Sequence, residues 1–324
     1  MPITSITKNP ESLTMTVVAD FGVPVQRLWD AYADPRQLER FWGPPTYPSR
    51  FTRHDMWPGG RSDYAMTGPE GEVHRGYWEF LNVDPITSFE VLDGFANPDG
   101  SANTELPATR MVFEFSPTDA GSRVTTVSHF TTLADLEQLL EMGVEEGLRA
   151  AMGQMDDVLA DLRSFAAGRP CEADILSDTQ VRVARVIRGS VPQVWRAYHD
   201  ADLMQRWLHG PDGWTLPVCE LAETVGDTYR YEWEAEDGSQ RFGFTGELLE
   251  SVPQSRVVTT EAMIGMEGPS TVNELAFIPV ADGTLLSLVI TYPDAAMRDM
   301  ILGTGMTSGM ETSYERLESV LATV

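Results

Sequence analysis

Few polar residues of this chain have a type and spacing that could support metal binding or nucleophilic catalysis. The five histidines are His54, His74, His129, His199 and His209. No two of them stand at the spacing of a metal-ligand pair. The two cysteines, Cys171 and Cys219, match no metal or redox motif, and the chain has neither a glycine-rich phosphate loop nor a nucleophile elbow. We therefore expect no metal ion and no cofactor.

Acid–base chemistry has three candidates, all on predicted strands. His74 has the same strand parity as Trp78, and Arg75 follows it directly. Glu234 shares a strand face with Glu232. Carboxylates and imidazoles on one strand face can transfer protons. The alternative is that these side chains form an ordinary solvent-facing stripe.

The elements that would position such side chains occur twice along the chain. Residues 25–32 reappear as residues 191–198, and Asp34 and Arg40 recur as Asp200 and Arg206. Further matches follow in the same order, so we infer two diverged copies of one domain. Small residues with Gly and Pro at 166–170 mark the boundary. We predict domains at 1–165 and 178–324, joined by a linker at 166–177.

Each copy has the same expected order of elements. A strand at 13–21 or 179–187 precedes two short helices, and several strands joined by Gly-containing turns follow. Leu and Met at steps of three and four residues predict a long C-terminal helix. This order predicts an α+β fold with antiparallel pairing in each copy.

Paired glycines interrupt the pattern of each predicted long helix. Gly143 and Gly147 in copy one match Gly305 and Gly309 in copy two. A glycine costs about 1 kcal/mol against alanine inside a helix, so a repeated pair indicates a purpose. Either the glycines leave room for a ligand or a crossing strand, or the segment is a loop and the helix starts after it.

The motifs of copy one resemble a known family. They are Val25-x-x-Leu28-Trp29-x-Ala31, Asp34-Pro35 and Leu38-x-x-Phe41-Trp42-Gly43-Pro44. They look like the opening of the family named after the activator of Hsp90 ATPase, a branch of the START and birch-pollen-allergen superfamily. The resemblance covers about residues 13–163 and, more loosely, 179–322. It implies two helix-grip domains, each a curved antiparallel sheet wrapped around a long C-terminal helix.

The resemblance also implies an apolar pocket between sheet and helix in each copy. The expected ligand-binding residues are Trp42, Tyr64, Met66, Trp78, Phe113 and Met152 in copy one, and Trp207, Tyr231, Trp233, Phe244 and Met310 in copy two. Their aromatic and thioether side chains suit a hydrophobic ligand. The alternative is that they simply fill the core.

Charge excludes several classes of partner. The formal net charge of -26 over 324 residues disfavours binding to nucleic acids and to anionic membrane surfaces. The sequence contains no run of about 18 apolar residues, and its first residues lack the pattern of a signal peptide. We expect a cytoplasmic protein.

Three functions remain open from the sequence. Binding of a small hydrophobic molecule fits the residue types and the missing catalytic motifs. The alternative of a cyclase or lyase requires His74, Arg75 or Glu234 to face a closed pocket. The family name suggests a third function, as partner of an Hsp90-type chaperone. In a further possibility, one copy is vestigial and serves as a docking surface for the other.

Overall fold

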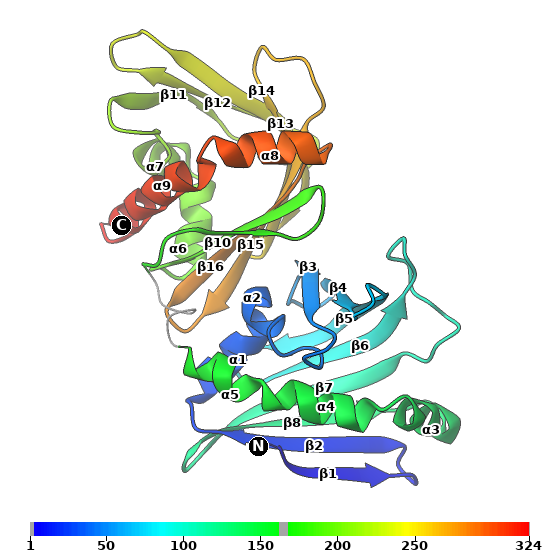
Figure 1. Cartoon of the computed structure of the whole chain (residues 1–324). Coiled ribbons are helices and arrows are strands. Elements are labelled where there is room, and N and C mark those ends of the chain that lie inside the picture. Colours follow the sequence, from blue (N-terminus) through cyan, green and yellow to red (C-terminus); the bar gives the residue numbers. More distant parts are fainter. Residues whose placement is uncertain (1–2, 162–167, 324) are drawn as a thin grey trace. The chain divides into compact units, whose positions relative to one another are not determined.

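The chain forms two compact units, which we call unit one and unit two. The computed structural model describes residues 3–161 and 168–323, and Figure 1 labels its elements. Unit one comprises Met1–Ser164 and unit two Phe165–Val324. Each contains an eight-stranded sheet with helices packed on it. The predicted α+β, helix-grip class is therefore confirmed for both copies.

Unit one has an antiparallel sheet whose strand order is β1-β2-β8-β7-β6-β5-β4-β3. The strands are β1 (Ile3–Asn9), β2 (Thr14–Phe21), β3 (Ser49–His54), β4 (Arg61–Thr67), β5 (Val73–Asp84), β6 (Ser88–Ala96), β7 (Thr109–Thr118) and β8 (Gly121–His129). The helices are α1 (Val25–Ala33), α2 (Pro35–Leu38), α3 (Leu133–Glu141), α4 (Val144–Gly153) and α5 (Met155–Ala160). Figure 1 shows α3, α4 and α5 following one another along the same side of the sheet.

Unit two repeats this plan, with the strand order β11-β12-β13-β14-β15-β16-β10-β9. The strands are β9 (Glu172–Ile175), β10 (Gln180–Ile187), β11 (Trp214–Glu220), β12 (Thr228–Ala235), β13 (Arg241–Val252), β14 (Arg256–Met263), β15 (Thr271–Val280) and β16 (Gly283–Thr291). The helices are α6 (Val191–Tyr198), α7 (Ala201–Trp207), α8 (Ala295–Gly303) and α9 (Met306–Leu321). The two sheets thus share one topology.

One edge strand in each unit lies outside the predicted elements. β1 precedes the predicted first strand and pairs with β2. β9 lies inside the segment 166–177, which we had predicted to be a linker, and it pairs with β10. Residues 166–167 of that segment lie outside the described residues. β1 is mostly polar and β9 has only four residues, which is why their sequences do not stand out as strands.

Alternating side chains build the core of each sheet. In β2, the inward-facing Met15, Val17, Ala19 and Phe21 are buried, while their neighbours are half-buried. Tyr32 of α1 packs its ring against the aromatic rings of β6 and β7, with centroids 5.3–5.9 Å apart. Such tilted and edge-to-face contacts stabilise aromatic clusters beyond simple burial. The predicted helix face at 25–32 is thereby the face that holds α1 on the sheet.

The closing helix is interrupted in both units, unlike the predicted continuous helix. Gly143 and Gly305 adopt the left-handed conformation, with φ of 81° and 77°, directly before α4 and α9. Helix continues on the other side of each break, as α3 and α8. A Cβ on Gly147 or Gly309 would meet nothing within 4 Å. A crossing strand is therefore not the reason for Gly147 and Gly309. Gly143 and Gly305, in contrast, are required by the left-handed backbone at the helix break.

The two glycines of α9 should respond oppositely to alanine. Gly305→Ala should cost about 1 kcal/mol, because an L-residue is strained at positive φ. Gly309→Ala should stabilise the protein by up to about 1 kcal/mol, because it lies in regular helix with open space around it. Urea unfolding of both variants checks this pair. Equal effects of the two substitutions would contradict the assignment of the break to Gly305.

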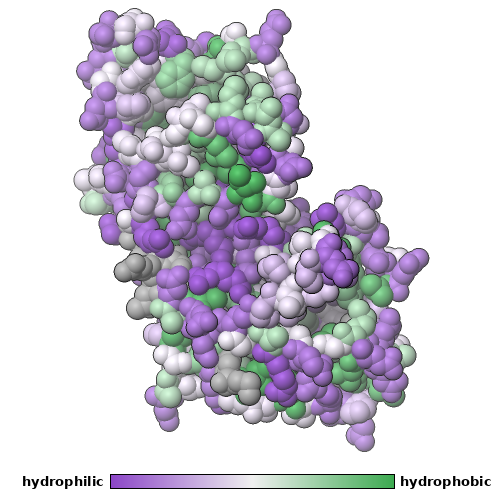
Figure 2. Space-filling model, in the orientation of Figure 1, coloured by the Kyte–Doolittle hydropathy of each residue, from purple (hydrophilic) through white to green (hydrophobic). Residues whose placement is uncertain are grey.

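Hydrophilic residues cover most of the face seen in Figure 2, and hydrophobic residues gather there in smaller groups. Large exposed hydrophobic side chains of unit two include Met263, Met266 and Met300. Within the described residues, no helix is long and apolar enough to span a membrane.

Candidate functional site

A tyrosine and a carboxyl group meet inside unit one. Tyr64 lies on β4 and Asp93 on β6, and the Tyr64 hydroxyl donates a hydrogen bond of 3.1 Å to Oδ1 of Asp93. The two strands are separated by β5, so the tyrosine ring must cross it. Gly76 of β5 permits this crossing, since a Cβ there would lie 2.3 Å from Cζ of Tyr64. The absence of a side chain at Gly76 thus has a local role in unit one.

Asp93 lies on the core-facing side of the sheet because it is at an alternate position from Phe89 and Val91. Phe89 and Val91, at the same parity of β6, are buried. Across the strand pair, Asp93 lies opposite Trp78, which is 0% exposed. A carboxyl group therefore occupies a position in an otherwise hydrophobic stripe.

The surroundings shift the protonation of this pair. Burial raises the pKa of Asp93 to about 7, against the opposing effect of the Tyr64 hydroxyl and the Trp78 indole. Burial and the nearby Asp93 together hold the pKa of Tyr64 well above its ordinary value. Within residues 3–161 and 168–323, no Arg or Lys forms an ion pair with Asp93. The carboxyl group can therefore exchange a proton near neutral pH.

Two tryptophans complete the lining around the pair. Trp42 lies edge-on to Trp78, with ring centroids 4.6 Å apart, and its ring is 6.3 Å from that of Tyr64. The indole nitrogens of Trp42 and Trp78 are buried without a hydrogen bond of ordinary geometry. The Trp78 indole nonetheless lies close enough to Asp93 to lower its pKa. The pair is thus enclosed mainly by aromatic rings.

Unit two contains a related pair. The Tyr229 hydroxyl on β12 donates to the backbone oxygen of Thr260, at 2.9 Å, and lies 3.4 Å from Oε2 of Glu261 on β14. Burial raises the pKa of Glu261, while Asn273 and Tyr229 oppose the shift through hydrogen bonds. Here, too, the tyrosine ring crosses a glycine, Gly246 of β13. Both copies therefore place a carboxyl group beside a tyrosine two strands away.

The indoles of unit two differ from those of unit one. Trp207 donates its indole N–H to the Ala197 carbonyl at 3.0 Å, and Trp233 donates to the Leu208 carbonyl at 2.6 Å. These hydrogen bonds fix both rings to the backbone of α6 and α7. The expected difference between the two copies extends to their tryptophans.

The residues predicted to bind a ligand divide into buried and accessible groups. Buried ones are Trp78, Phe113, Met152, Trp207 and Trp233, and half-buried ones are Trp42, Tyr64, Met66, Tyr231, Phe244 and Met310. Trp42, Tyr64 and Trp78 contact one another. In unit two, Tyr231, Phe244 and Trp233 form a second ring cluster. Five of the eleven residues are thus buried in the core, and six keep exposed surface.

The three acid–base candidates lie apart from these interior pairs. His74 has the inward parity but is exposed near the strand end, with its ring 5.7 Å from that of Tyr47. Arg75 is exposed at the opposite parity. Glu234 is half-buried and pairs with Arg241 at 3.8 Å. The structure therefore does not bring them together in a closed pocket.

Asp93 and Glu261 were absent from the sequence-based candidates. A single acid among apolar or neutral residues at alternate positions of a strand could have identified them. Asp93 follows Phe89 and Val91 in this way, and Glu261 follows Val257 and Thr259. An inward acid has to be hydrogen-bonded or functional, because burying a lone carboxylate is costly.

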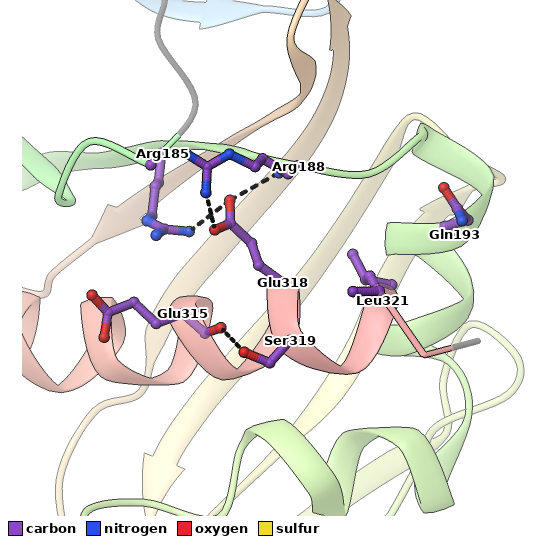
Figure 3. A pocket seen from close by; sticks show the side chains of 9 residues that line it. Arg185, Arg188, Gln193, Glu315, Glu318, Ser319 and Leu321 are labelled. Atoms are coloured by element: carbon purple, nitrogen blue, oxygen red, sulfur yellow. Dashed lines mark hydrogen bonds and ion pairs between the residues drawn. The ribbon is translucent and has the colours of Figure 1, made fainter.

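A separate, polar pocket of about 500 Å³ opens beside α9 (Figure 3). Arg185, 1% exposed at its side chain, pairs there with Glu318 at 3.4 Å and with Glu311 at 3.1 Å. Arg188 also pairs with Glu318, at 3.5 Å. These charges neutralise one another, so the pocket is an ion-pair network that anchors α9 to β10. Among the described residues, no group of His, Cys, Asp and Glu is arranged to hold a metal ion.

Known proteins resemble both halves of the chain. The family model for activator of Hsp90 ATPase homolog 1-like proteins matches residues 22–160 and 188–322. A crystal structure of a Mycobacterium smegmatis protein is 47% identical, with 49% of this chain and 97% of that chain covered and a TM-score of 0.46. An Arthrobacter aurescens protein is 40% identical, with coverages of 49% and 92% and a TM-score of 0.47. A Rhodobacter sphaeroides protein is 26% identical, with coverages of 48% and 100% and a TM-score of 0.46. No curated protein matches the chain.

Proposed function

Because the chain belongs to the activator of Hsp90 ATPase homolog 1-like family in both of its units, we propose that it binds small, mostly hydrophobic molecules between sheet and closing helices. One observation carries the proposal. Tyr64 and Asp93 lie deep within unit one, yet both keep solvent-accessible surface. Half-buried polar side chains among buried aromatic rings can border a bound molecule and fix its orientation.

The closing helices support the same function. No residue of α8 is buried, although Met297, Ile301 and Leu302 pack partly against Val181 and its neighbours. Half-buried Met and Ile side chains under a loosely held helix can rearrange around a guest molecule. The left-handed glycine after α8 allows that helix to move without distorting α9. A cytoplasmic location is part of this proposal.

A ligand screen on the full chain tests the proposal. Lipids, polyketides and aromatic compounds would be added during thermal unfolding, and at least one class should raise the melting temperature. A ligand present at about 100 times its Kd stabilises a protein by about 2.7 kcal/mol, which corresponds to a shift of about 5–10 °C for a unit of this size.

Variants locate the bound ligand. Met66→Trp should fill the accessible side of the Tyr64 cluster and lower the affinity of unit one about tenfold or more. Leu81→Trp, at an outward position that is 50% exposed, is the matched control and should leave binding unchanged. If no compound class shifts the melting temperature, or if Met66→Trp and Met310→Trp together leave the affinity unaltered, the proposal is wrong.

A further inference from the structure

Asp93, half-buried among aromatic rings, stands out among the charged groups in the interior of unit one. Several other buried charges have partners of opposite sign: Asp34 pairs with Arg36, Glu232 with Arg241, and Arg185 with Glu311. Glu261 of unit two resembles Asp93 but has the amide of Asn273 as an additional partner. The partners of Asp93 within the described residues are a phenol and an indole, both neutral. A buried carboxyl group without a counter-charge is costly. The missing positive charge is therefore the feature that a ligand can supply.

The walls around Asp93 also suit a cation. Tyr64 and Trp78 adjoin the carboxyl group, and the half-buried Trp42 packs its ring against both of theirs. The face of an aromatic ring attracts a cation, and tryptophan does so best. A net charge of -26 adds a long-range field that draws cations toward the protein. An anionic ligand would instead be repelled both by this field and by the carboxylate of Asp93.

We propose that unit one selects an organic cation, an amine carried on a hydrophobic body, whose ammonium group pairs with Asp93 between the rings of Trp42 and Tyr64. This assignment rests on the proposed function, because it requires that a ligand enters the interior. The Tyr64 hydroxyl donates to Oδ1 of Asp93 and the Trp78 indole adjoins the same carboxyl group; the remaining lone pairs of the two carboxylate oxygens can accept from the ammonium group. Unit two differs, since the tyrosine of its pair is also bonded to the backbone at Thr260 and Glu261 has the additional partner Asn273.

Three probes of one shape test the assignment by calorimetric titration of the full chain at about pH 8. Naphthylmethylamine carries the positive charge, naphthylmethanol replaces it with a neutral donor, and ethylnaphthalene has no polar group. We expect the amine to bind about tenfold more tightly than either neutral probe. Asp93→Asn should abolish this preference while leaving the affinity for ethylnaphthalene unchanged. Glu114→Gln, on the exposed face of β7, is the matched control and should keep the preference.

Each remaining outcome is decisive. Equal affinities for the amine and ethylnaphthalene overturn the cation assignment but leave the proposed function standing. Equal affinities for the amine and naphthylmethanol show recognition of a donor and not of charge, which also overturns it. If Asp93→Asn still prefers the amine, the preference comes from general electrostatics or from unit two, and the assignment to Asp93 is wrong. If none of the three probes binds, and the screen above is also negative, the proposed function itself fails. Far-ultraviolet circular dichroism of Asp93→Asn verifies that the variant is folded.

Discussion

Asp93→Asn is expected to make unit one more stable than the wild type above neutral pH, by up to about 4 kcal/mol. Burial raises the pKa of Asp93 to about 7 in the folded protein, whereas an unfolded chain has the ordinary value near 3.9. Asparagine has nearly the same shape, keeps an acceptor for the Tyr64 hydroxyl and carries no charge. It therefore removes the cost of burying a carboxylate.

The direction of the pH dependence follows from proton binding. Between about pH 4 and 7, the folded state holds a proton on Asp93 that the unfolded state has lost, so wild-type stability falls as pH rises through this window. Above about pH 7 both states are ionised and this contribution is flat. The advantage of Asp93→Asn should thus be about 2–3 kcal/mol larger at pH 8 than at pH 5.

Urea unfolding at both pH values, followed by tryptophan fluorescence, measures this difference. Glu114→Gln removes a charge from an exposed position of the same sheet and controls for the general repulsion within an acidic protein. Its advantage over the wild type should change by less than about 0.5 kcal/mol between the two pH values. An equal pH response of the two variants would contradict the burial of an ionisable Asp93.

Local patterns were sufficient to predict the α+β class and the order of the elements, whereas the helix-grip arrangement was implied by the family resemblance. The strand at 13–21 became β2, and the repeated segments 25–32 and 191–198 became α1 and α6. Alternation and helical spacing act over a few residues, so they survive in the sequence without knowledge of tertiary contacts. The edge strand β1 was missed because it is mostly polar and shows no hydrophobic alternation, and β9 was missed because its four residues are too few for alternation to be significant.

The interior pairs depend on contacts that no local pattern records. Tyr64 reaches Asp93 across an intervening strand. This contact is possible only because a third residue, Gly76, has no side chain in the way. The three are far apart in sequence and combine only through the sheet register. His74 shows the converse limit, because its parity was right but its place near the strand end exposes it. Strand parity predicts the face of a side chain and not its depth.

Gly246→Ala is expected to destabilise unit two by about 2–3 kcal/mol, the upper range for overpacking a core. A Cβ at this position would lie 1.8 Å from the backbone oxygen of Thr260. Backbone atoms of a paired strand cannot rotate away, so β13 and β14 would have to separate. The same movement would disturb the hydrogen bond from Tyr229 to that oxygen.

Gly76→Ala in unit one is the matched substitution and should behave differently. Its Cβ would collide with the ring of Tyr64, 2.3 Å away, and not with backbone. A side chain can swing aside, so the expected cost is about 1 kcal/mol, the net value of the lost hydrogen bond to Asp93. Urea unfolding of the two variants compares these costs, and ligand titration of Gly76→Ala should show weaker amine binding because Tyr64 no longer borders Asp93. If both alanines destabilise the protein equally and Gly76→Ala leaves amine binding intact, the crossing of Gly76 by the Tyr64 ring does not shape the site.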